Sequence, residues 1–467
     1  MKPWKKVLIV AIVVSALVLA PAATWLGILS VDEAPLDDSD LRVERAEVPD
    51  EENGYGYFTR MSEVVDMPEE TGESSEEEGE QTEPPTGRAL VDAILEGRAW
   101  DADFVADLWR RNEEAIRLLD EGLACETVQA PPMAIGTLIP EVFGWIDVAR
   151  LVDLHTVLLF KQGVEVEAFE EAMRLVRFGQ AIEGSKGGMV HYLVGAMVKG
   201  MGLARLRAMS HGTTLGGEVL TSYARRLGAY GANEQGMADA FRVEYEMCLQ
   251  VLEDYAAGKF SLEEFGRVGS APSQPASSRP LPFFFHPNET RNLFVQAFRP
   301  MVESASLPFS EAQVMRSGIP ARHLLDGWRL WLEGNGMGVR LYSILSSATD
   351  TALKQKCREA SEVAATRVLL AMKAFKVEKR RLPETLDELV PEYLDAVPLD
   401  DFDGKPLRYN AEKKVIYSVG EDLKDGGGMT KEEQKTWWSK EHPGWNEEEY
   451  GEPDIWGMPD PSFPIAF

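Results

Sequence analysis

The stretch that decides the fold of the C-terminal part is Arg381–Gly428, RLPETLDELVPEYLDAVPLDDFDGKPLRYNAEKKVIYSVGEDLKDGGG. Pro383 lies at the start of an amphipathic segment, where proline is tolerated because its missing N–H needs no helical partner. We therefore predict a short helix with Leu386 and Leu389 facing inward, ended by Pro398 and the DDFDGK turn.

A hairpin and an acidic loop follow this short helix. The alternating residues of Pro406–Tyr409 and Val415–Val419 predict two paired strands joined across Asn410–Lys414. A long helix over Ser361–Glu378 precedes the stretch. Apolar residues at helical spacing predict its buried stripe, which comprises Ala364, Val368, Met372 and Phe375. The chain thus predicts a small α+β module at 360–467.

The order of long helix, LPETLDELVPEYLDAVPLDDFDGKPLRYN and YSVGEDLKDGGG resembles the C-terminal end of type II secretion major pseudopilins. The match covers roughly 365–428, with Pro453-Asp454-Ile455 as a weaker echo of their ending. The whole arrangement is also similar to that of uncharacterised, membrane-anchored bacterial proteins of planctomycete type. The resemblance implies a long helix, a small sheet and an acidic loop that holds calcium.

The residues of the loop leave two interpretations open. Asp422 and Asp425 lie three residues apart among glycines, where carboxylate and backbone oxygens could ligate calcium, and Asp454 is a more distant candidate ligand. The spacing differs from that of an EF-hand, and by itself it favours a solvated Asp/Gly turn. The tryptophan-rich tail is also open, since it could pack over the module or form a sugar- or peptide-binding face.

The segment 88–359 has mostly helical periodicity and predicts a multi-helix domain, so the fold class is mainly α. Amphipathic helices are predicted at about 146–160, 166–178, 189–209, 217–227 and 237–256. Asp101 or Asp103 is expected to cap a helix that carries Phe104 and Leu108. Glycines in Met189–Met209 indicate a close approach between helices, because glycine is costly inside a helix.

Residues 31–87 predict a disordered acidic linker. Twenty acidic residues face three arginines between Asp32 and Glu83, whereas the whole chain has a net charge of −29. Such a tract buries too little apolar surface to offset its ordering entropy. Inside it, VPDEENGYGYFTRM at 48–61 is an aromatic island that could instead dock onto the main domain.

The N-terminal residues 1–30 predict a membrane anchor or a signal segment. Lys2, Lys5 and Lys6 precede the uncharged run Val7–Ser30, which is long enough to span a bilayer. Lysines before the run and acids after it place the N-terminus in the cytoplasm and the body outside a bacterial cytoplasmic membrane, crossed in a single pass. The alternative is a cleaved signal peptide, with Ala20-Pro21-Ala22 as its cleavage site.

No catalytic motif accompanies these features. The sequence lacks G-x-S-x-G, H-E-x-x-H and a phosphate-binding loop, and its three cysteines form no C-x-x-C. The acidic balance excludes nucleic acid as a partner, because such binding needs basic residues on phosphates. We expect a non-enzymatic envelope protein with an interaction or scaffolding role, with a possible envelope protein partner. The alternative is an extracytoplasmic hydrolase or carbohydrate-active enzyme using a carboxylate pair that only the fold brings together.

Overall fold

The computed structural model describes residues 31–69, 85–259, 285–316, 335–345, 349–445 and 453–467. The predicted anchor at 1–30 and residues 70–84 of the predicted linker lie outside these ranges. The chain divides into two compact units. The smaller comprises the described parts of 31–42, 244–301 and 318–349, and the larger those of 43–243, 302–317 and 350–467.

The larger unit is mainly helical, which confirms the predicted class, and the helices predicted between 146 and 256 are all present. Asp101 caps α4 as expected, by accepting a hydrogen bond from the Phe104 amide. The helices of this unit are α2 (Gly54–Val64), α3 (Gly87–Leu95), α4 (Ala102–Arg111), α5 (Glu113–Ala124), α6 (Glu141–Lys161), α7 (Glu165–Glu183), α8 (Met189–Gly212), α9 (Gly217–Arg226), α13 (Phe309–Arg316), α15 (Thr349–Lys379) and α16 (Lys431–Glu441).

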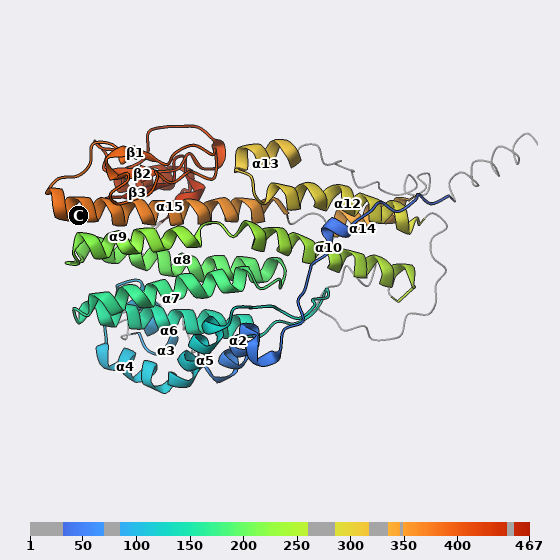
Figure 1. Ribbon diagram of the computed structural model, residues 1–467, viewed down its shortest axis with the longest axis horizontal. Helices are drawn as coiled ribbons and strands as arrows, with labels where there is room; N and C mark the ends of the chain where they lie inside the picture. Colours follow the sequence, from blue (N-terminus) through green and yellow to red (C-terminus); the bar gives the residue numbers. More distant parts are fainter. Residues whose placement is uncertain (1–30, 70–84, 260–284, 317–334, 346–348, 446–452) are drawn as a thin grey trace, which may run out of the picture. The chain divides into compact units, whose positions relative to one another are not determined.

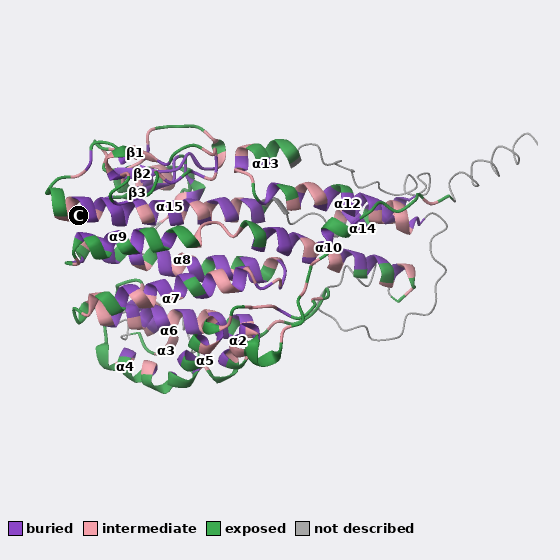
Figure 2. Ribbon diagram, viewed as in Figure 1, coloured by how far each residue is buried: buried purple, intermediate pink, exposed green. Residues whose placement is uncertain are grey.

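Helices α7 and α8 form the central layer of the larger unit (Figure 1). On one side they contribute to a core shared with α2, α3, α4, α5 and α6. On the other side they contribute to a core shared with α9, α15 and the C-terminal sheet. Figure 2 shows buried residues along both helices and along α15. The α7–α8 pair therefore faces two hydrophobic cores rather than one.

Glycines hold α7 and α8 close together, as the sequence predicted for Met189–Met209. A Cβ atom at Gly195 would lie 2.6 Å from the Gly179 carbonyl oxygen, and one at Gly179 would lie 2.5 Å from the Lys199 amide nitrogen. Real Cβ atoms do not approach a backbone so closely, so glycine is needed at both positions. The contact fixes the distance between the two central helices.

We predict opposite stability changes for two glycine substitutions in α8. Gly195→Ala forces the helices apart and should cost roughly 1–3 kcal/mol, as overpacking does. At Gly200 the nearest atom to a new Cβ is Glu362 Oε2 at 3.8 Å. Gly200→Ala should therefore stabilise the protein by about 1 kcal/mol through helix propensity. Urea unfolding of both variants checks this, and a loss of equal size in both would contradict the close approach.

Residues 31–69 are ordered, so the prediction of a disordered linker is wrong for this part of 31–87. Asn53 caps α2 by accepting from the Tyr55 amide, and Tyr55, Phe58 and Met61 are buried in the core. Trp145 Nε1 donates to the Phe58 carbonyl at 3.0 Å. Apolar residues at helical spacing bury enough surface to outweigh the acidic composition around them.

The C-terminal module is a three-stranded antiparallel sheet packed with α15. Strand β1 (Arg408–Asn410) pairs with β2 (Val415–Tyr417), which confirms the predicted hairpin, and β2 also pairs with β3 (Ser462–Pro464). Leu386 and Leu389 are buried in a short 3-10 helix, and the predicted stripe of α15 is buried too. Helix α15 begins before residue 360, and module and helices share one core.

The smaller unit contains the second half of α10 (Glu234–Ala256), most of α12 (Pro287–Ser304), and α14 (Gly336–Leu345). Asp38 attaches the N-terminal segment to this unit. Its carboxylate accepts a hydrogen bond from Tyr245 at 2.6 Å and pairs with Arg291 at 2.7 Å and Arg42 at 2.9 Å. These bonds order another part of the tract that its composition marked as a linker.

Candidate functional site

The three predicted metal ligands each have protein partners in the structure. The Asp425 carboxylate forms an ion pair with the Arg408 guanidinium at 3.2 Å and accepts a hydrogen bond from the Tyr417 hydroxyl at 3.0 Å. Asp422 accepts from the Lys424 amide, and Asp454 accepts from the Trp456 amide at the start of a short 3-10 helix. Asp454 thus caps a turn, while Asp425 belongs to an ion-pair cluster around Arg408.

Arg408 supplies the positive charge in the acidic turn region. Its guanidinium pairs with Asp403 at 2.5 Å and with the fully buried Asp400 at 3.1 Å, besides Asp425. Asp400 also accepts from the Val419 amide at 2.9 Å and the Ser418 hydroxyl at 2.8 Å. These bonds join the DDFDGK turn to the sheet.

Asp460, two residues before β3, is the acid that lies against the Asp/Gly loop. It accepts from the Gly426 amide at 3.0 Å. Burial raises the pKa of Asp460, and the negative charges of Asp425 and Asp422 add to the rise. Within the described ranges no group of three His, Cys, Asp or Glu side chains is arranged to hold a metal ion. Arg408 and backbone amides already bind these carboxylates, so their arrangement does not fit a calcium site. Calcium binding remains a prediction that comes from the resemblance alone.

The tail packs over the module at Trp456, which was one of the two interpretations left open. The Trp456 ring is buried, stacks on Phe402 with centroids 5.8 Å apart, and donates through Nε1 to Glu362 at 3.1 Å. A Cβ atom at Gly457 would lie 2.9 Å from the Trp438 ring. These tryptophans therefore contribute to packing.

A fully buried ionic centre joins α7, α8 and α15. Lys199 Nζ lies 2.6 Å from Glu183 Oε2, pairs with Glu359, and also reaches the Gly231 carbonyl at 3.4 Å. Tyr192 donates to Glu359 at 3.2 Å. The Lys199 and Glu183 side chains have no solvent exposure and that of Glu359 has 1%. The centre is a converging carboxylate pair, but it lies in the interior and solvent does not reach it.

The protonation of this centre follows from its charges. Burial raises the pKa of Glu183 well above its ordinary value, and the charge of Glu359 raises it further. Burial alone would lower the pKa of Lys199, but Glu183 and Glu359 outweigh it and leave that pKa raised. Glu183 therefore keeps its proton to a higher pH than an exposed carboxyl does, while the Lys199 ammonium stays charged.

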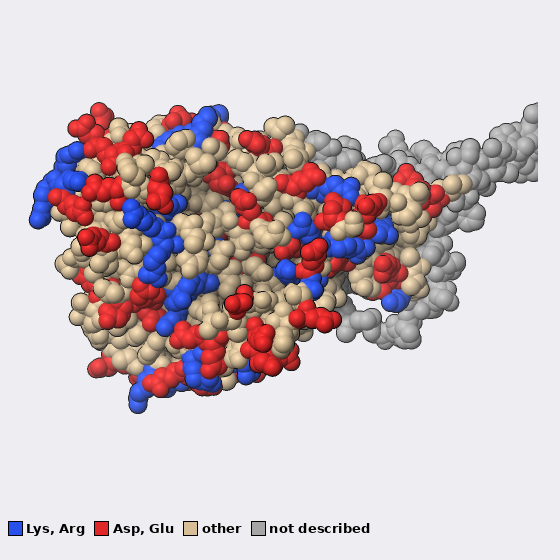
Figure 3. All heavy atoms as spheres, in the orientation of Figure 1, with Lys and Arg blue, Asp and Glu red and all other residues tan. Residues whose placement is uncertain are grey.

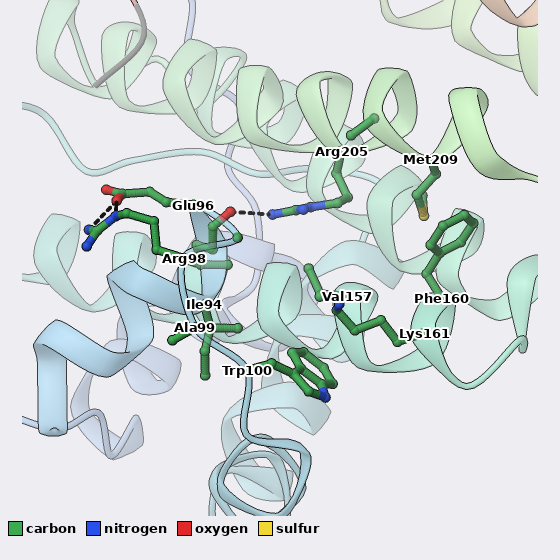
Figure 4. A pocket seen from close by; sticks show the side chains of 13 residues that line it. Ile94, Glu96, Arg98, Ala99, Trp100, Val157, Phe160, Lys161, Arg205 and Met209 are labelled. Atoms are coloured by element: carbon green, nitrogen blue, oxygen red, sulfur yellow. Dashed lines mark hydrogen bonds and ion pairs between the residues drawn. The ribbon is translucent and has the colours of Figure 1, made fainter. Parts of the chain in front are cut away.

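An open groove lies where the C-terminal halves of α6 and α8 meet the turn after α3 (Figure 4). Its volume is about 670 Å³, within the range of small-molecule sites. Its buried apolar side chains are Ile94, Val157 and Met209; Phe160 is half-buried, and Trp100 is 39% exposed. A second depression, of about 540 Å³, is lined by polar residues of α9 and the end of α15.

Three cationic side chains line the groove, and two of them have carboxylate partners. Arg205 pairs with Asp153 at 2.6 Å, and Arg98 pairs with Glu96. The Lys161 ammonium instead lies 4.7 Å from the centroid of the Trp100 ring, a cation–π contact. No described acidic residue forms an ion pair with Lys161. Among the residues that the structure describes, Lys161 is thus the one lining cation without a carboxylate partner.

One face of α8 is apolar and open to solvent along most of the helix. Val190 is 49%, Leu193 37% and Met197 42% exposed. With a 100° step per residue, the exposed or half-exposed residues of this face fall within about a third of the helix circumference. They are Val190, Leu193, Val194, Met197, Met201, Ala204 and Ala208. We call this set the α8 face; it is about 27 Å long at 1.5 Å per residue.

Some of these features have a signal in the sequence, and others have none. The residues of the α8 face lie in the apolar run Met189–Met209. Such a run does not distinguish a helix with an exposed apolar face from a helix buried on all sides. In the sequence, Lys199 appears only as an isolated charge inside that run. Its partners Glu183 and Glu359 are 16 and 160 residues away along the chain, so periodicity could not join them. Trp100 and Lys161 likewise come from separate elements.

No match was found in comparisons with protein-family models, curated proteins and solved structures. Within the described residues, every helix is too short or too polar to cross a bilayer.

Proposed function

We propose that this protein is a membrane-anchored scaffold outside the cytoplasmic membrane, and that its α8 face binds a second envelope protein. The single observation that carries this proposal is the length of the row of uncharged side chains on α8, which are exposed except at Val194 and Met201, where they are half-buried. Isolated exposed apolar residues are normal, but a continuous apolar patch marks an interaction site. Anchoring comes from the predicted segment 1–30.

Charge favours a protein over a lipid surface as the occupant of the α8 face. The net charge of −29 opposes adsorption to an anionic membrane surface. On the face drawn in Figure 3, Lys and Arg side chains are interspersed with Asp and Glu rather than gathered in one basic field. An apolar strip on an otherwise charged surface is the composition of a protein interface with a hydrophobic centre and a polar rim.

The proposal predicts a complex that a charge on the α8 face disrupts. Full-length protein extracted from its own membranes in mild detergent should migrate as a complex larger than the monomer on native gels. Leu193→Lys combined with Met197→Lys should reduce that complex by at least about tenfold, since burying a charge in an apolar interface costs several kcal/mol. Both side chains are exposed, so the substitutions leave the cores intact.

Val219→Lys is the matched control, because Val219 is 38% exposed on α9 and lies outside the α8 face. It should leave the complex unchanged. A complex composed only of this chain, or one that the control and the double variant weaken equally, would contradict the proposal.

A further inference from the structure

We propose that the groove beside Trp100 binds a small amphiphilic monocarboxylate, with the carboxylate at Lys161 and the apolar body against Trp100 and Val157. This inference does not depend on the proposed scaffold function, because the residues that carry it, Lys161, Trp100 and Val157, lie outside the α8 face, and Ala208 alone borders both. It concerns a small ligand, whereas the α8 face was assigned to a protein. The groove lies wholly within the larger unit.

The shape of the groove suits a ligand with a small apolar body. Ile94 and Met209 are each 2% exposed and belong to the two cores, and Val157 beside them is 9% exposed, so the three form a fixed apolar surface. The half-buried Phe160 ring and the Trp100 indole, which is 39% exposed, add aromatic surface to the groove; both are labelled in Figure 4. Apolar walls with a few polar groups are typical of pockets that bind small organic molecules.

The charges that line the groove favour a ligand with a single negative charge. The Arg205 guanidinium is held by both carboxylate oxygens of Asp153, at 2.6 and 2.9 Å, and Arg98 is neutralised by Glu96. Lys161 remains as the cation whose described contact is an aromatic face. A carboxylate can accept a charge-assisted hydrogen bond from this ammonium. A second negative charge near the Glu96 end would be repelled.

Lys161 and Trp100 act together in this site. The Lys161 ammonium lies over the indole ring at 4.7 Å, so the ring holds the exposed side chain at the mouth of the groove. The same ring offers apolar area to the ligand body. Each residue therefore has a separate role: Lys161 recognises the carboxylate, and Trp100 contributes to binding whether or not the ligand is charged.

Calorimetry with octanoate and its neutral isostere octanamide tests the site. The full-length chain is held in lipid nanodiscs, with empty discs as the blank. We expect saturable binding with one site per chain, and octanoate should bind roughly tenfold more tightly than octanamide, the ratio that one charge-assisted hydrogen bond supplies. Lys161→Met should abolish this preference while retaining octanamide binding, and Trp100→Ala should weaken both ligands.

Lys424→Met, a change of an exposed lysine remote from the groove in sequence and fold, is the control and should leave both affinities unchanged. Each variant is also checked for an unchanged melting temperature, so that misfolding is not read as lost binding. Octanoate binding that is absent, or that Lys161→Met and Trp100→Ala leave intact, would overturn the assignment of the groove.

Discussion

Replacing Lys199 by methionine should lower the free energy of unfolding by about 3–5 kcal/mol, the cost of breaking a buried ion pair by removing one partner. Methionine has a similar length but no charge, so Glu183 and Glu359 would face each other without a cation. Both carboxyls are inaccessible to solvent, which cannot replace the lost partner. Urea unfolding followed by circular dichroism measures the change.

Two further variants separate the ionic effect from packing. Adding Glu183→Gln and Glu359→Gln to Lys199→Met removes the uncompensated charge and should recover most of the loss, because a neutral replacement of a buried ionic cluster is often nearly neutral in stability. The exposed Lys424 supplies the control, since Lys424→Met should stay within about 0.5 kcal/mol of wild type. A Lys199→Met protein as stable as wild type would show that the centre does not hold α7, α8 and α15 together.

The same centre gives a pH dependence with a defined sign. The pKa of Glu183 in the folded protein is raised well above 4.5. The folded state therefore binds a proton that the unfolded state releases, and the stabilising contribution is complete below pH 4.5 and is lost as the pH rises toward the folded pKa. The difference in unfolding free energy between Glu183→Gln and wild type should consequently shift in favour of the variant between pH 5 and pH 8.

Phe58→Ala should destabilise the protein by about 3–5 kcal/mol, the usual cost of truncating a buried phenylalanine. The Phe58 side chain is completely buried and meets the Phe178 ring edge-on with centroids 5.0 Å apart. If the acidic tract were a linker, the substitution would have no effect. Thermal unfolding of the full-length protein distinguishes the two expectations.

Tyr57 is the matched control for Phe58, because it is the neighbouring aromatic residue on α2, about 100° away around the helix, and lies at the edge of the core. Its half-buried ring contacts Arg60 at 4.4 Å. Tyr57→Ala should therefore cost about 1 kcal/mol or less. Equal losses from Phe58→Ala and Tyr57→Ala would contradict the placement of α2 in the core.

Because α2 belongs to the core, a soluble form of the protein should begin at about residue 31 and not at residue 87.

The C-terminal module was predictable because its signals are local. Proline at the helix start, alternation in two short strands and the stripe of α15 each depend on residues close in the sequence. Strand β3 was not predicted, because Ser462–Pro464 is three residues long and its partner β2 lies more than 40 residues earlier.

In the acidic tract, overall composition led to the wrong prediction of a disordered linker at residues 31–69. Averaged over 31–87, acidic charge dominates, yet Tyr55, Phe58 and Met61 recur every three residues and form one helical face. The candidate sites were beyond prediction for another reason. The groove at Trp100 and the centre at Lys199 join residues from three helical regions each, and side-chain pairing across such distances depends on the fold.

The most direct test of the proposed scaffold function is photo-crosslinking from the α8 face in intact membranes. A benzophenone side chain is placed at Met197, and at Val219 as the control, both exposed and apolar positions. We expect the probe at position 197 to form one discrete adduct with a second protein, lost when Leu193→Lys is added, and the probe at 219 to form none. The same adducts from both positions, or adducts with lipid alone, would contradict a protein partner on the α8 face.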